Sequence, residues 1–306
     1  VMIKTLKVGV SMYETYSIKE KIKLFYIILI PILITQVSMN LMNFFNTIMS
    51  GRAGPVDLAG VAIGSSIWFP IFTGINGILI AITPIIAHLL GSKDHESVPE
   101  KVQQGIYLSA GLGFLVMVIG FFILEPILNA MKLEAGVHRV AKYYLLNLGV
   151  GIIPLFIFNT LRNFIDALGK TRTSMTIILI SLPINLFFNY VFVFGKFGVP
   201  AFGGIGSGIA TAITYWLICV IAFVIVHHLV PFKQYHIFRN WRTPSLKTWW
   251  EQLKIGVPIG FAIFFESSIF AAVTIMMSSY STFTIAAHQA AINFNSLLYM
   301  VPLSIG

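Results

Sequence analysis

The sequence predicts an all-α integral membrane protein built from consecutive membrane-spanning helices. The first observation is the composition: 57% of residues are hydrophobic and only 10% are charged, whereas an average soluble domain carries about 25% charged residues. The second is the length of the apolar runs, since about 20 predominantly apolar residues cross the hydrocarbon of a bilayer. The third is the punctuation of these runs by Gly, Pro and charged residues, which marks loops.

Eight helices are expected from the apolar lengths and the breaks between them. Their ranges are 23–49, 58–90, 104–131, 141–165, 174–194, 205–229, 255–280 and 284–306. Segments 51–55, 91–96 and 195–200 combine helix breakers with charge and are read as loops. The first apolar run is too long for the hydrophobic region of a cleavable signal peptide, so we expect it to remain as a membrane helix.

Lys and Arg residues are distributed unequally between alternate connectors, and such residues favour the cytoplasmic side. Five of the 20 fall on one side: Arg52, Lys132, Arg139, Lys142 and Lys196. The other fifteen share the side of the N-terminus. We therefore expect a multi-pass protein of the cell membrane, either a bacterial inner membrane or a plasma membrane, with a cytoplasmic N-terminus. Residues 1–22 are expected to form a basic amphipathic segment at that face.

Several classes of function are disfavoured by what the sequence lacks. Cys219 is the single cysteine, so a disulfide within the chain and a CxxC metal or redox site are excluded. The net charge of +9 lies in short connectors and not on one helix face, which argues against nucleic acid as a partner. GxSxG, HExxH and Walker motifs are missing, so we expect neither an enzyme nor a cofactor.

An internal repeat appears when the chain is shifted by 227 residues. Pro31 then falls on Pro258, residues 47–49 on 274–276 with the same Thr-Ile-Met sequence, and Ala59 on Ala286. A shift of six helices keeps the orientation, so the expected architecture is two parallel six-helix repeats, as in many transporters. On this reading residues 23–230 form the first lobe, 231–254 a cytoplasmic linker, and 255–306 the start of a truncated second lobe.

Glu266 is the acid that lies midway along an expected membrane helix. A carboxylate at that depth either takes up a proton or holds a cation, and is a functional hypothesis by default. The alternative is a protonated Glu that hydrogen-bonds a neighbouring helix.

Polar amides form a second group of candidates. Gln36, Asn40 and Asn43 share one face of the first helix, and Asn185 and Asn189 are spaced i and i+4 on the fifth. The remaining members are Asn46 on the first helix and His288, Gln289, Asn293 and Asn295 on the eighth. Interhelical hydrogen bonding and a shared polar cavity are equally good readings of these residues.

Aromatic and charged residues add weaker candidates. Trp68 and its aromatic neighbours fit lipid contact and helix packing, although some could stack on a flat organic cation. Arg162 and Asp166, near the cytoplasmic end of the fourth helix, are read as an anchoring cluster or as a gate.

The strings NFFNTIMSG (43–51), LAGVAIG (58–64) and LRNFIDALGKTR (161–172) resemble the multidrug and toxic compound extrusion (MATE) family, in its NorM-like branch. GGIG (203–206) and AAHQ (286–289) agree. The resemblance implies a monomeric exporter of cationic, aromatic drugs that takes in Na⁺ or H⁺, with two lobes rocking between inward- and outward-open states.

The resemblance also implies residue roles. Glu266 matches a coupling carboxylate and a possible Na⁺ ligand, Gln36 a cavity position, and Asn185 and Asn189 a polar pair of the first lobe. Many NorM-like members have Asp where this chain has Asn46, so a proton site in the first lobe is in doubt. The substrate cavity is expected to include Gln36, Asn40, Asn43, Trp68, His288, Gln289 and Asn293.

Other functions stay open. A lipid-linked substrate flippase of the same superfamily would favour a basic cavity, and a membrane-embedded enzyme would need at least two convergent catalytic groups. An inactive fragment of the exporter is a further reading, because the expected second lobe stops within an apolar run.

Overall fold

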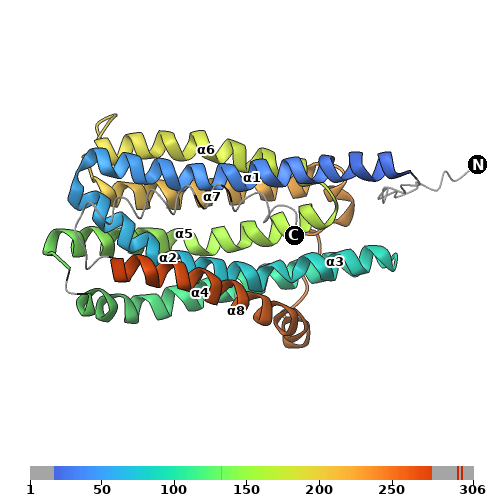
Figure 1. The fold of residues 1–306 in the computed structure, drawn as a ribbon. Helices are drawn as coiled ribbons and strands as arrows, with labels where there is room; N and C mark the ends of the chain where they lie inside the picture. The colour runs from blue at the N-terminus through green and yellow to red at the C-terminus, as the bar shows by residue number, and fades with distance from the viewer. Residues whose placement is uncertain (1–16, 132, 278–294, 296–297, 299–306) are drawn as a thin grey trace, which may run out of the picture.

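The protein is a bundle of long helices that run side by side along one axis, with the connections gathered at its two ends (Figure 1). The structure is a computed structural model and describes residues 17–131, 133–277, 295 and 298. The helices are α1 (Ile18–Ala53), α2 (Pro55–Ile80), α3 (Ile82–Gly91), α4 (Val98–Ala130), α5 (Ala135–Ala167), α6 (Thr171–Phe194), α7 (Gly204–His228) and α8 (Leu246–Met277), with a 3₁₀ turn η1 (Phe232–Tyr235).

Six spans in the described residues are long and apolar enough to cross a membrane, with α2 and α3 together forming one of them. The all-helical membrane fold is therefore confirmed for this part of the chain. Of the expected eighth helix, only residues 295 and 298 are described.

The expected helix 58–90 is divided at Ala81, which the sequence analysis did not anticipate. Pro84 has no N–H to donate to the carbonyl of Ile80 four residues earlier, so the helical ladder is interrupted there. The Ala81 N–H instead reaches the Ile78 carbonyl at 3.3 Å, and Asn163 of α5 donates its side-chain amide to the Leu79 carbonyl at 3.1 Å. Helices commonly kink where a proline or an inserted side chain replaces the regular i to i−4 backbone hydrogen bonds.

The linker predicted over 231–254 is partly helical. It contains η1, and α8 begins at Leu246. Pro31 of α1 and Pro258 of α8 both lie in the first half of their helices, as the internal repeat predicts.

The core lies around α5, whose described span is the most buried of the six. Phe156, Phe158, Leu161 and Phe164 are fully buried there. By contrast α4 presents large apolar side chains such as Phe121 and Phe122 to its surroundings. In lipid these exposed apolar groups have no need of a protein partner.

The start of α7 is fixed to the start of α2. Gly203 has φ 58°, a conformation that L side chains rarely adopt, and a Cβ there would overlap the Asp57 carboxylate. The Gly204 N–H donates to Asp57 Oδ1 at 2.6 Å. The Gly-Gly pair thus allows Asp57 to cap one of the N–H groups that a helix start leaves unpaired.

Close helix packing joins α8 to α2. A Cβ atom built on either Gly77 or Gly260 would meet the opposite helix. The Cβ built on Gly77 would lie 2.8 Å from the Gly260 Cα. Small residues at such a crossing let two backbones approach closely. Beside the crossing, the hydroxyls of Thr73 and Ser267 are hydrogen-bonded at 2.8 Å.

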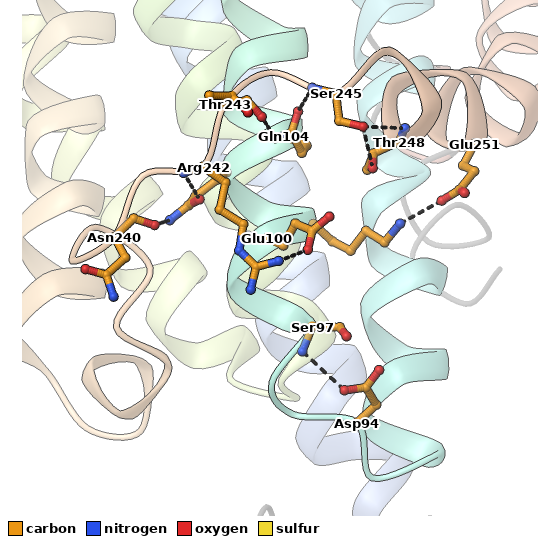
Figure 2. A network of polar contacts seen from close by, with 12 residues as sticks. Asp94, Ser97, Glu100, Gln104, Asn240, Arg242, Thr243, Ser245, Thr248 and Glu251 are labelled. Carbon is orange, nitrogen blue, oxygen red and sulfur yellow. Dashed lines mark hydrogen bonds and ion pairs between the residues drawn. The ribbon is translucent and has the colours of Figure 1, made fainter.

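The linker is held against the start of α4 by two buried glutamines. Gln103 donates to the carbonyls of Ile237 (2.6 Å) and Asn240 (2.8 Å) and accepts the Arg242 N–H (3.0 Å). Gln104 donates to the Thr243 carbonyl and accepts the Ser245 N–H, both at 2.8 Å, as Figure 2 shows.

Ion pairs flank these glutamine contacts. Arg242 pairs with Glu100, and Lys101 of α4 pairs with Glu251 of α8 at 2.6 Å (Figure 2). The Lys101 ammonium lowers the pKa of Glu251 through this hydrogen bond. Because Glu251 is half-exposed, the stability that the pair adds is small; it is present at neutral pH and is lost as pH falls through the lowered pKa.

Candidate functional site

Three of the predicted amides meet between α1 and α6. Asn189 donates its side-chain amide to Asn46 Oδ1 at 2.8 Å and to Asn185 Oδ1 at 3.0 Å. Asn185 and Asn189 are fully buried, and Asn46 is nearly so. The i, i+4 spacing on α6 places both asparagines on the face that meets α1.

Hydroxyls from α7 complete this group, which we call the asparagine cluster: Asn46, Asn185, Asn189, Thr211 and Thr214. Asn46 donates to Thr211 Oγ1 at 3.4 Å, and Asn185 donates to Thr214 Oγ1 at 3.3 Å. Both threonines are buried and donate to carbonyls of their own helix. Neither threonine was among the predicted site residues, although Ser207, Thr211 and Thr214 form an i, i+4, i+7 polar stripe on an apolar helix.

The asparagine cluster is neutral and rich in oxygen atoms. Among the described residues the buried Asn189 Oδ1 has no hydrogen-bond partner, and neither has Ser207 Oγ, one turn before Thr211 on α7. An unpaired buried carbonyl is costly and oxygen is the ligand atom that hard cations prefer. The cluster can therefore offer carbonyl and hydroxyl oxygens to Na⁺, but its amides cannot carry a proton.

The other α1 amides lie elsewhere on the helix. Gln36 and Asn40 are half-buried and Asn43 is exposed. Asn40 donates to the Gln36 carbonyl at 3.0 Å. Their predicted place in a substrate cavity stays a prediction, and His288, Gln289 and Asn293 lie outside the described residues.

Glu266 lies on α8 next to Ser267, which bonds Thr73 of α2. Its side chain is exposed in the described structure. Because α8 packs on α2 and α4, Glu266 belongs to a different set of helix contacts from the asparagine cluster, which lies on α1, α6 and α7.

Arg162 and Asp166 form an ion pair at 3.5 Å on α5. Asp166 also accepts a hydrogen bond from Ser174 of α6 at 2.6 Å, while the Arg162 guanidinium reaches Met39 Sδ of α1 at 3.6 Å. The pair thus connects three helices near the end of α5, a position that suits either an anchor or a gate.

Trp68 packs inside the bundle. Its ring stacks on Phe156 of α5 with 6.5 Å between centroids, and it lies 6.0 Å from Phe72. Packing is therefore its described role, and a part in binding substrate stays a prediction.

The sequence model of the MatE family matches residues 31–191 and 258–306. The chain belongs to the MatE family. The two matched segments begin at residues 31 and 258, which is the 227-residue shift of the internal repeat. This family comprises transporters and not enzymes.

Curated relatives of this MatE chain carry the name probable multidrug resistance protein NorM. That of Oceanobacillus iheyensis is 63% identical over 295 residues, covering 96% of this chain and 66% of the relative. That of Bacillus subtilis is 55% identical, with 96% and 65% covered. The chain thus spans slightly less than two thirds of the length of these relatives.

Solved structures share the fold. An outward-facing multidrug resistance MATE family transporter of the MOP superfamily superposes with a TM-score of 0.79 at 18% identity, covering 92% of this chain and 62% of the other. The eukaryotic MATE transporter AtDTX14 gives 0.78 at 20% identity, with 94% and 63% covered. At these identities the likeness establishes the fold alone.

Proposed function

We propose that the whole protein exports organic cations from the cell in exchange for Na⁺ or H⁺ moving inward. The names of the curated relatives support multidrug efflux as the activity. The observation that carries the ion coupling is the asparagine cluster, a buried group of oxygen atoms in an apolar bundle with an unpaired acceptor at Asn189 Oδ1.

The two candidate ion sites differ in chemistry. At the asparagine cluster a cation must be held by neutral oxygens, which favours Na⁺ over a proton. Glu266 can hold Na⁺ or take up a proton, since either neutralises a carboxylate at membrane depth. We assign Na⁺ to the cluster, and to Glu266 the coupling carboxylate of the second lobe.

Substrate export follows from alternating access between two repeats. A cation bound in one lobe changes which packing of that lobe is favoured, and thereby couples ion entry to drug release. The predicted cavity residues Gln36, Asn40 and Asn43 on α1 supply neutral polar contacts for a flat organic cation. Trp68 would serve mainly to fix α2 against α5.

The test is ethidium efflux from proteoliposomes that contain the whole protein, driven separately by a Na⁺ gradient and a proton gradient. We expect a Na⁺ gradient to drive efflux, and both Asn189→Ala and Glu266→Gln to abolish it. Asn147→Ala is the matched control, because within the described part of the chain Asn147, an amide on α5, bonds only the Tyr143 carbonyl of its own helix.

Each other outcome has a definite meaning. Efflux driven by protons alone, with Asn189→Ala unaffected, would remove the asparagine cluster from the coupling mechanism. If neither the Na⁺ gradient nor the proton gradient drives ethidium efflux, the antiporter is rejected and the flippase of lipid-linked substrates is favoured.

A further inference from the structure

A basic cavity lies where α7 ends and the linker begins. It has a volume of about 240 Å³ and is lined by Val226, His227, His228, Lys233, His236, Ile237, Phe238 and Arg239. Five of these lining residues carry basic side chains, and none is Asp or Glu. Neither the family match nor the ion sites discussed above account for it.

The positive charge of this cavity has no acidic partner among its lining residues. The sequence from Val226 to Lys247 contains no acid. Arg242 in the same segment is neutralised by Glu100, whereas the described ion pairs include neither Lys233 nor Arg239. The adjacent Tyr235 hydroxyl is neutral at physiological pH, and burial raises its pKa further.

The backbone beneath the basic side chains is firmly held. Phe232, Tyr235 and Ile237 are buried, and Phe232 and Tyr235 pack edge-on against Phe164 of α5. Lys233, His236 and Arg239 alternate with them and are exposed. The cations are thus presented on an ordered surface, so binding a ligand there costs little backbone entropy.

The surroundings of the cavity are those of a membrane interface. His227 and His228 are the last two residues of a membrane-spanning helix. Near this helix end the exposed apolar residues are Phe223, Val224, Leu229, Val230 and Trp241. An apolar surface next to a basic cavity fits a molecule with acyl chains and an anionic head, and clusters of basic residues next to membrane helices bind such headgroups.

We propose that this cavity binds the phosphate group of an anionic phospholipid headgroup. Lys233 and Arg239 supply the permanent charges, and the exposed imidazoles add hydrogen-bond donors. The acyl chains lie along Phe223 and Val224 on the outer face of α7. The occupant is a lipid and not free phosphate, because the cavity lies at the end of a membrane-spanning helix, where phospholipid headgroups are concentrated.

The experiment uses the whole protein in nanodiscs of phosphatidylcholine with and without phosphatidylglycerol, and counts retained lipids by native mass spectrometry. We expect phosphatidylglycerol to be retained preferentially. In the double variant Lys233→Gln/Arg239→Gln this preference should fall by about fivefold or more, since each basic residue near a membrane surface contributes appreciably.

The matched control is Lys170→Gln/Arg172→Gln, which removes one Lys and one Arg from exposed positions at the same end of the bundle. It should keep the preference. An equal fall in the control would show a diffuse attraction to basic connectors, and no preference in the wild type would reject the site. Displacement of phosphatidylglycerol by millimolar inorganic phosphate would likewise overturn the lipid assignment. All these variants are on the surface, and equal thermal unfolding confirms that each is folded.

Discussion

At the scale of single residues, buried polar groups stand out because the rest of the bundle is apolar. Asn185 and Asn189 are fully buried, yet each reaches a partner on another helix. Such hydrogen bonds contribute about 0.6 kcal/mol on average in membrane proteins, too little to explain three clustered asparagines by stability alone. Their arrangement therefore fits a binding role better than a purely structural one.

A second residue-scale feature is Gly203, whose backbone and surroundings both require glycine. We expect Gly203→Ala to destabilise the protein by roughly 1–3 kcal/mol through backbone strain, and further through overlap with Asp57. Gly198→Ala is the control, because Gly198 also has a positive φ, of 83°, but has open space around its Cβ position.

Thermal unfolding of the purified variants in detergent tests this prediction. Gly203→Ala should have the lower apparent midpoint of the two. Equal midpoints would mean that Asp57 moves aside without cost and that the cap on α7 contributes nothing.

At the scale of elements, apolar length and helix breakers predicted the described helices well, because a membrane span needs little more than about 20 apolar residues. The division between α2 and α3 was missed, since it depends on Asn163 of α5 as well as on Pro84. A side chain from another helix cannot be inferred from the local sequence around the kink.

The asparagines of the candidate site were predicted from the sequence, and its threonines were not. Asn185 and Asn189 were recognisable from their spacing, and Asn46 as a polar amide on an apolar helix; the family resemblance added a coupling role for these residues. Thr211 and Thr214 were not, because threonines in helices commonly donate to their own backbone, as both do here. Their second role, as acceptors for asparagines, depends on how α7 is rotated against α1 and α6.

The crossing of α2 and α8 gives a prediction at this scale. A Cβ on Gly260 would lie 2.6 Å from the Gly74 carbonyl oxygen, so Gly260→Leu should push the helices apart, at a cost of about 1–3 kcal/mol for overpacking. Gly120→Leu is the control, since a Cβ on Gly120 of α4 meets nothing within 4 Å.

Crosslinking measures the separation. In a Cys219→Ser background, Thr73→Cys and Ser267→Cys replace hydroxyls that are 2.8 Å apart, and a short thiol crosslinker should join them. The yield should drop sharply with Gly260→Leu and stay unchanged with Gly120→Leu. An unchanged yield in both would show that α8 does not depend on this glycine contact.

At the scale of the whole molecule, the distribution of basic residues predicts the orientation. Lys93 follows α3 at the end of the bundle that carries the linker, whereas Lys196 lies in the α6–α7 connection at the opposite end. From the excess of Lys and Arg at the linker end we predict that this end faces the cytoplasm.

Labelling of single cysteines with a membrane-impermeant maleimide checks this orientation, again without Cys219. Lys196→Cys should react in intact cells, and Lys93→Cys only after permeabilisation. The reverse pattern would invert the topology and place the basic cavity on the outer leaflet.

The attachment of the linker to α4 has a consequence for protein engineering. Gln103 and Gln104 bind main-chain groups of residues 237–245 and none of their side chains. Hydrogen bonds to the main chain do not depend on which side chain the residue carries. Epitope residues or fluorescent labels can therefore replace Asn240 or Thr243 without releasing the segment. Proline at position 242 is the exception, because it would remove both the N–H that Gln103 accepts and the ion pair to Glu100, and would weaken the attachment of the segment to α4.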